Sequence, residues 1–187
     1  MKRLMKKKSI LALLGVGMAV GSCFMLNKEV EASIERTKVD EFANVLDISA
    51  SPTERTNGVY DTNYYNNFSD LGAWHGYYQP EKSKKELLGG FAGPLIIAEE
   101  YPVNLSASLN KLTVKNKKSG EQYDLSQSNR IDLSYYPGRL EQTYELDDII
   151  IHLSLIFVSD RTALIQTNIT NSGKEALIIS KLDRLDI

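Results

Sequence analysis

Along much of the chain, hydrophobic residues recur at every second position, which is the pattern of β-strands rather than of helices. The clearest example is the segment 149–158. One face of this segment is fully apolar and carries Ile149, Ile151, Leu153, Leu155 and Phe157. The opposite face is mixed but still largely apolar, with Ile150, His152, Ser154, Ile156 and Val158. Two such faces predict a central strand that is covered on both sides.

Further strands are predicted around this segment, and turn signals separate them. They are expected at 94–101, 109–115, 122–125, 139–146, 162–170 and 175–181. Asp147-Asp148 marks the reversal before the central strand, and Asn171-Ser172-Gly173 predicts a hairpin between the last two strands. Residues 81–88 are the one helix candidate, a turn or two long. Consecutive antiparallel strands at this spacing predict an all-β protein, an antiparallel β-sandwich.

The end of the chain qualifies this expectation. A length of 187 residues allows one domain with a small appendage. Residues 182–187 follow the last predicted strand without a capping turn or a polar tail. We therefore expect the β-sandwich to be incomplete, as in a fragment or in the product of an early stop.

Residues 1–32 are predicted to be a signal peptide rather than part of the fold. Lys2, Arg3 and Lys6–Lys8 form a basic segment, and an apolar run follows at 10–26. Val30-Glu31-Ala32 has small or apolar residues at the two positions that a signal peptidase reads. Cleavage after Ala32 predicts an exported protein, secreted or held in the cell envelope.

Two alternatives for this segment stay open. Val20-Gly21-Ser22-Cys23 resembles a lipobox, which makes Cys23 a candidate lipidation site and the protein a lipoprotein. Against this, the apolar run continues past Cys23, where a lipobox normally ends it. The other alternative is a retained membrane anchor, for which an apolar run of about 17 residues is at the lower limit.

Residues 33–67 are polar, rich in Asn, Thr, Asp and Ser, and show little periodicity. They predict a surface leader that wraps around the fold, and the β-sandwich domain itself is expected at 68–187. Without residues 1–32 the chain keeps 16 basic and 22 acidic residues, a net charge of −6. This charge gives no reason to expect nucleic acid as a partner, and a single cysteine excludes a disulfide framework.

Motifs for catalysis or metal binding are scarce. One cysteine and two distant histidines exclude a zinc site made from those ligands alone. The sequence has no nucleophile elbow and no phosphate-binding loop, so no cofactor is predicted. Glu99 and Glu100 are candidate carboxylates, but successive strand residues point to opposite faces and cannot act as a pair. His152 alternates with core residues and is interpreted as a hydrogen-bonded sheet histidine.

The segment 68–78 stands out because it contains the single tryptophan, Trp74, close to Asp70 and His75. Aromatic rings can stack on sugar C–H surfaces, and Asp and His can bind hydroxyl groups, so the segment is a candidate carbohydrate site. The alternative is a core tryptophan beside glycines that let strands approach closely.

The same segment begins a family resemblance. Phe68–Gly76, Gly89–Pro94 and Glu99–Tyr101 are similar to the N-terminal domain of bacterial α-glucosidases of glycoside hydrolase family 63, the YgjK type. The similarity continues in the same order through Ala107-Ser108, Leu112–Val114, Tyr136–Gly138 and Asp160–Leu164. It covers 68–170, whereas the segments before and after match poorly. Each motif alone is weak, and the ordered set is specific.

This resemblance implies a β-sandwich packed against an (α/α)6 barrel that hydrolyses α-glucosidic bonds with inversion. Both catalytic carboxylates of the family belong to the barrel, so the resemblance assigns no catalytic residue to this chain. The partner that it implies is a catalytic domain, in cis or in trans. Asp70, Trp74 and His75 are expected in the region facing that barrel; with Glu99 and Glu100 they are candidates for substrate or domain contacts. A domain without its barrel is expected to self-associate through an exposed apolar patch. A stand-alone secreted carbohydrate-binding β-sandwich is the alternative.

Overall fold

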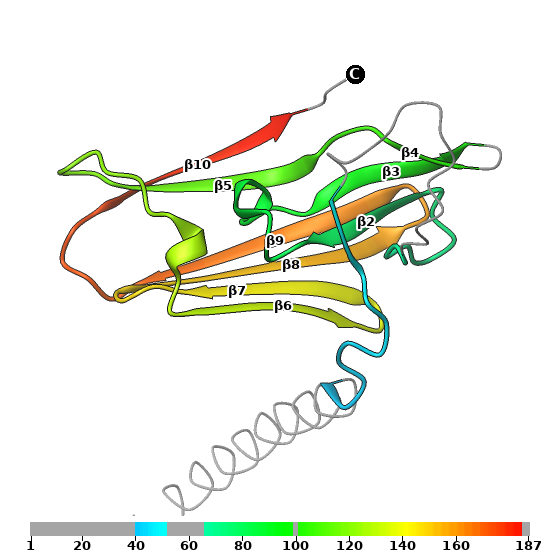
Figure 1. Ribbon diagram of the computed structural model, residues 1–187, viewed down its shortest axis with the longest axis horizontal. Coiled ribbons are helices and arrows are strands. Elements are labelled where there is room, and N and C mark those ends of the chain that lie inside the picture. The colour runs from blue at the N-terminus through cyan, green and yellow to red at the C-terminus, as the bar shows by residue number, and fades with distance from the viewer. Residues whose placement is uncertain (1–39, 52–65, 99–100, 185–187) are drawn as a thin grey trace, which may run out of the picture. The chain divides into compact units, whose positions relative to one another are not determined.

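The computed structural model describes residues 40–51, 66–98 and 101–184 (Figure 1). The chain divides into two compact units, residues 1–42 and 43–187, and everything below concerns the second. The predicted signal peptide and Cys23 lie outside the described residues. Within the described ranges, no helix is long and apolar enough to cross a membrane.

The described residues form ten strands and two short 3₁₀ helices, which confirms the all-β prediction. The strands are β1 Ser49–Ala50, β2 His75–Pro80, β3 Ala92–Ala98, β4 Tyr101–Asn104, β5 Ser108–Asn116, β6 Arg130–Tyr136, β7 Arg139–Glu145, β8 Ile149–Ser159, β9 Thr162–Asn171 and β10 Leu177–Arg184. The 3₁₀ helices are η2 Lys85–Leu87 and η3 Leu125–Gln127. Three open sheets result, with strand orders β1-β2-β3-β4, β10-β5 and β6-β7-β8-β9.

The sheet β6–β9 is an antiparallel meander, and Figure 1 shows its four strands side by side. Asp147 and Asp148 form the turn between β7 and β8, as predicted. Gly138, in the turn between β6 and β7, has a φ of +88°, a conformation that glycine adopts without steric cost. β8 is central in this sheet, as its apolar pattern predicts.

One face of β7 and β8 packs against the other two sheets and makes the core. We call the sheet β6–β9 one layer and the other two sheets together the second layer. Apolar side chains from β2, β5, β7 and β8 meet there, together with Phe91, in one cluster. Four of its β8 members are Ile149, Ile151, Leu153 and Leu155. Burying each such side chain stabilises the fold by about 1.5–3 kcal/mol, so this face accounts for much of the burial that holds the layers together.

The opposite face of β8 differs from the prediction. Ile150 is 47% exposed and Val158 is 52% exposed, so the described residues do not cover this face. The apolar residues there led us to expect cover on both sides. They alternate with His152, whose Nδ1 lies 3.2 Å from Thr143 Oγ1 on the same face. A face that is partly exposed to solvent can carry both apolar and polar side chains. The period of the pattern alone therefore does not distinguish a partly exposed face from a covered one.

The prediction of a hairpin between the last two strands is wrong, because β9 and β10 do not pair with each other. β10 pairs antiparallel with β5 in the other layer, with Ile179 opposite Val114. Asn171-Ser172-Gly173 therefore joins the two layers instead of closing a hairpin; Ser172 N donates to Asp148 O at 2.8 Å. The physical reason is the core, since Val114 is buried and partly buried Leu177 packs against the same cluster. Hairpin signals report a reversal of the chain but not the strand that receives it.

The predicted strand at 122–125 is also wrong. Only a single bridge, between Lys115 and Gln122, forms there. The chain then enters η3, where the Asp124 carboxylate accepts a hydrogen bond from Ser126 N at 2.9 Å. This is the capping contact that favours Asp at the start of a helical turn.

Residues 43–51 contribute more to the fold than the surface leader expected for 33–67. Ile48 is only 3% exposed and belongs to the main core cluster. β1 pairs in parallel with the end of β2, so that Gln79 N donates to Ile48 O at 2.9 Å. A short apolar segment inside a polar stretch supplies this strand, and its brevity is why composition gave no sign of it.

A buried polar network connects the two layers. Gln142 on β7 has no exposed surface, and its Nε2 donates to Gln79 Oε1 at 2.9 Å and to Gly90 O at 2.8 Å. Its Oε1 accepts from the Tyr144 hydroxyl at 2.9 Å, and that hydroxyl accepts from Gly89 N at 2.9 Å. Burial raises the pKa of Tyr144, which keeps the phenol protonated as a donor.

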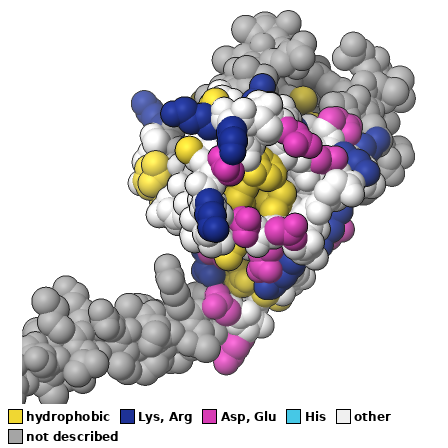
Figure 2. Space-filling view, turned by 90° about the vertical axis from the view of Figure 1, so that its left-hand side faces the viewer, with side chains coloured by type: hydrophobic (Ala, Val, Ile, Leu, Met, Phe, Trp, Pro, Cys, Tyr) yellow, Lys and Arg dark blue, Asp and Glu magenta, His cyan; other side chains and the backbone are white. Residues whose placement is uncertain are grey.

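At one end of the molecule, hydrophobic side chains reach the surface. Figure 2 shows hydrophobic side chains surrounded by acidic and basic ones on this side of the molecule. Leu146, after β7, and Leu177, at the start of β10, are only partly buried. The charged pairs near these strand ends include Arg130–Glu145, with 3.2 Å between nitrogen and oxygen. Apolar side chains at the margin of the core thus reach the surface at these strand ends.

Candidate functional site

The loop that carries Trp74 is a tight reversal between Phe68 and Tyr77. These two residues exchange backbone hydrogen bonds of 2.8 and 2.9 Å, which closes the loop. At its tip, Leu71 has a φ of +53° and Gly72 a φ of +71°, as at the two central positions of a type I′ turn. Ala73 N donates to Asp70 O at 3.0 Å across this turn. The turn leaves Leu71 57% exposed and Trp74 61% exposed.

Asp70 holds the turn in place. Its Oδ1 accepts from the backbone N–H of the next residue, Leu71, at 2.7 Å. Its Oδ2 lies 3.8 Å from where a Cβ on Gly138 would stand, so Asp70 is next to the turn between β6 and β7. The Trp74 loop and that turn therefore lie at the same end of the layers.

His75 lies beneath Trp74 in a group of aromatic rings. Its ring centroid is 5.1 Å from Trp74, 5.5 Å from Tyr77 and 5.1 Å from Phe157. His75 is only 8% exposed, and its buried Nε2 has no hydrogen-bond partner among the described residues. A buried ring nitrogen without a partner is a cost that most folded proteins avoid. The structure thus brings Trp74 and His75 into contact, with Trp74 outside and His75 inside.

The other predicted site residues do not join this group. Glu99 and Glu100 follow β3 and precede β4, and both lie outside the described residues. Cys23 lies outside them as well. Across the described ranges, no cluster of three His, Cys, Asp or Glu side chains could hold a metal ion.

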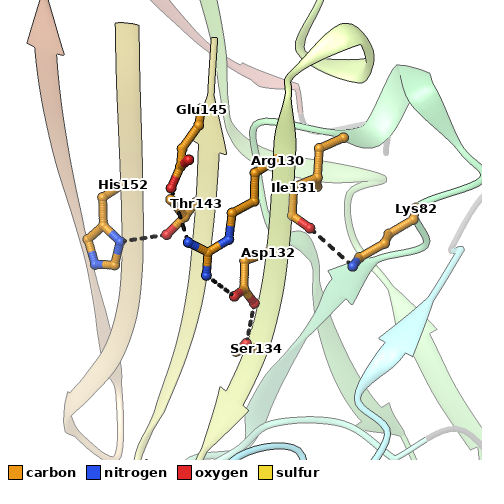
Figure 3. A network of polar contacts seen from close by, with 8 residues as sticks. All are labelled: Lys82, Arg130, Ile131, Asp132, Ser134, Thr143, Glu145 and His152. Atoms are coloured by element: carbon orange, nitrogen blue, oxygen red, sulfur yellow. Dashed lines mark hydrogen bonds and ion pairs between the residues drawn. The ribbon is translucent and has the colours of Figure 1, made fainter. Parts of the chain in front are cut away.

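The outward face of β6–β8 carries a polar network that the sequence pattern did not single out (Figure 3). Arg130 is paired with Glu145 and with Asp132, at 3.2 Å in each case. The Asp132 carboxylate also accepts from the Ser134 hydroxyl. These ion pairs are largely exposed to solvent and each contributes at most about 1 kcal/mol. The network therefore makes this face hydrophilic rather than strongly stabilising the fold.

A groove of about 440 Å³ lies between the segment 44–49, the end of β2 and β6. Its lining includes Asn44, Asp47, Pro80, Lys82 and Tyr135. Two hydrogen bonds from Ser49 hold the pKa of Asp47 below its usual range, so this carboxylate stays charged at neutral pH. The groove was not foreseen, because it depends on the segment before 52 packing against β6.

The described residues thus form an all-β domain of three open sheets, with Trp74 and His75 in contact at one end. The profile of the family described as "Glucosidase YgjK, N-terminal" matches residues 48–183. The chain belongs to this family, as its resemblance to family 63 glucosidases predicts. An N-terminal domain of a glucosidase implies a catalytic domain as its partner in cis. The match begins at residue 48, one residue before β1, and ends at residue 183, so it extends beyond 68–170 on both sides.

Proposed function

We propose that this chain is an exported β-sandwich domain that supports hydrolysis of α-glucosidic bonds by an (α/α)6 catalytic barrel and is inactive alone. The family match over 48–183 carries this proposal. Inverting hydrolysis needs two carboxyl groups about 6.5–9.5 Å apart, on opposite sides of the bond, with a water between. The family resemblance assigns both groups to the barrel, so the role of this domain is to hold and complete the barrel.

The reading frame downstream of residue 187 tests this proposal at low cost. A region encoding paired helices with two suitable carboxylates is expected, in the same frame or as a neighbouring gene. An unrelated neighbour would count against the proposal.

We infer that the Trp74 loop is the part of the domain that faces the barrel. Two large apolar side chains, Leu71 and Trp74, stand exposed on a loop held by Asp70. Exposed apolar groups in one place favour burial against a partner. Domain and barrel expressed as separate chains should co-purify, and Trp74→Ser should weaken that association. Val45→Ser, at another exposed apolar residue, is the matched control and should leave it unchanged. Equal effects of the two substitutions would exclude the loop.

Export by a cleaved signal peptide is tested at the N-terminus of the protein purified from cells. The proposal expects a chain that begins at Ser33. A chain that begins with a lipid-modified Cys23 would establish the lipoprotein alternative, and an unprocessed Met1 would contradict export with cleavage.

A second candidate function, carbohydrate binding without a barrel, is favoured by the exposed indole of Trp74. An exposed tryptophan on the same loop as a carboxylate, Asp70, is a suitable platform for a sugar ring. Calorimetry with maltose-type and other oligosaccharides should then give binding heat that Trp74→Ala abolishes. Absence of heat, or heat unaffected by Trp74→Ala, would reject this function and would not bear on the barrel-supporting role.

A further inference from the structure

The two edges of the sheet β6–β9 are treated differently by the rest of the fold. At the β6 edge, Asn44 N donates to Tyr135 O and Asn44 Oδ1 accepts from Tyr135 N, both at 2.8 Å. Lys82 Nζ donates to Ile131 O at 3.2 Å on the same strand (Figure 3). The β6 edge is therefore capped by its own chain.

The β9 edge has no such cap among the described residues. The backbone of β9 pairs with β8 on one side, and no hydrogen bond from another described segment reaches its other side. A hydrogen bond that does reach β9 from the other layer is made by side chains, with Lys181 Nζ donating to Thr167 Oγ1 at 3.1 Å. Strand edges of this kind present unpaired N–H and C=O groups to any strand that approaches.

The sequence of β9 contains none of the residue types that discourage strand pairing at an edge. Its sequence, TALIQTNITN, contains no charged residue, no proline and no glycine over ten positions. Other edges of these sheets are protected: β6 carries Arg130 and Asp132, β10 carries Lys181, and the four-residue β4 contains Pro102. Charge, proline and short length are the devices with which proteins block edges, and β9 uses none of them.

Burial also indicates that the layer stops short at β9. The inward residues of β8 that lie opposite β9, such as Leu153 and Leu155, have no exposed surface. Their β9 neighbours, Thr167 and Ile165, are only half-buried although they share the same inward face. Another strand paired with the free side of β9 would bury Thr167 and Ile165 as fully as their β8 neighbours.

We propose that β9 pairs antiparallel with β9 of a second copy of this chain, so that two four-stranded sheets join into one. A two-fold axis at Thr167 keeps inward side chains inward and places Ile165 of one copy opposite Ile169 of the other. On the outward face it places Gln166 opposite Asn168. Because β9 carries no charge, no like charges meet in this register. An isologous pair of this kind also uses up both open edges, so the association stops at a dimer.

Sedimentation of the 187-residue chain over a range of concentrations tests the proposal, with two lysine variants. Gln166→Lys with Asn168→Lys puts two pairs of like charges opposite one another, and the dimer dissociation constant should rise about tenfold or more. Ser154→Lys is the matched control, since Ser154 pairs with Gln166 on the same outward face but lies one strand in from the edge. The control should leave the dissociation constant within about twofold of the parent. Circular dichroism establishes that both variants fold.

Hydrogen exchange followed by mass spectrometry gives an independent measurement. Amides of β9 should become more protected as the concentration of the chain rises, whereas those of the capped β6 edge should not change. A chain that is monomeric at all concentrations would overturn the proposal, as would a dimer that the double lysine variant leaves intact. Protection of β9 in a monomer would show that a strand from elsewhere in the protein occupies the edge, which also overturns it.

Discussion

Replacing Gln142 by leucine is the substitution that best tests how the two layers are held together. Gln142 is fully buried, and its amide group makes hydrogen bonds to Gln79, Gly90 and Tyr144. Leucine has a similar size but no polar atoms. Gln142→Leu therefore leaves the Gln79 Oε1 and Gly90 O acceptors without this donor, and the Tyr144 hydroxyl without its acceptor.

The magnitude follows from these three losses. A buried polar group that loses its partner costs about 1–3 kcal/mol. Gln79 keeps part of its network, because its Nε2 still donates to Ser134 O and Glu141 O, each at 2.9 Å. Losses within one network are not additive, so we expect Gln142→Leu to lower the free energy of unfolding by about 3–5 kcal/mol. That is a large part, about a fifth or more, of the 5–15 kcal/mol by which domains are usually stable.

Urea unfolding followed by far-ultraviolet circular dichroism measures this change. Gln127→Leu is the matched control, because Gln127 is exposed and its Nε2 donates only to the neighbouring Ser126 hydroxyl. The control should change the free energy of unfolding by less than about 0.5 kcal/mol. If Gln142→Leu costs no more than the control, the buried network is not what couples β7 to β2 and the Gly89-Gly90 turn.

Three further predictions concern single positions. Gly90→Ala should cost about 2–3 kcal/mol in urea unfolding, because the new Cβ would lie 2.6 Å from Ser108 Oγ and 2.8 Å from Leu109 O. Gly120→Ala meets no atom within 4 Å, and a cost of only about 1 kcal/mol is expected from its left-handed φ, so equal costs would refute the clash. Burial lowers the pKa of Lys111, with Glu86 opposing more weakly, so the folded state binds its proton less tightly than the unfolded state. The stability of the parent relative to Lys111→Met should therefore increase as pH rises toward 10.5, the ordinary lysine value, and unfolding curves with no such trend would contradict this. Trp74→Ala should lower the unfolding free energy by less than about 1 kcal/mol because the side chain is mostly exposed, and a larger loss in thermal unfolding would place Trp74 in the core instead.

β2, whose six residues are all buried, and β6 were not predicted from the sequence. β5, β7, β8 and β9 were predictable because hydrophobic residues recur at every second position along them, and such alternation is a local property. It placed Leu140, Gln142 and Tyr144 on one face of β7, and all three are buried. It could not show that Gln142 would meet Gln79, because their contact joins positions 63 residues apart. The partner of β10 was missed for the same reason: pairing with β5 depends on which layer needs an apolar strand.

The candidate site was predictable only in part. The density of residues around Trp74 identified the loop, and the structure brings Trp74 and His75 together there. Their division into an exposed indole and a buried imidazole depends on Phe157, a β8 residue far along the chain, which packs against His75. The capped β6 edge could not be foreseen either, since it needs Asn44 from a segment whose composition resembles a surface loop.

Hydrolysis of an α-glucoside is the measurement that tests the proposed function most directly. It should be assayed with the purified 187-residue chain and with the native protein captured from cells by an antibody raised against this chain. The account predicts no hydrolysis by the chain alone, and hydrolysis by a captured protein or complex larger than the 21.0 kDa of this chain. Hydrolysis by the chain alone, or capture of an inactive protein no larger than 21.0 kDa, would contradict it.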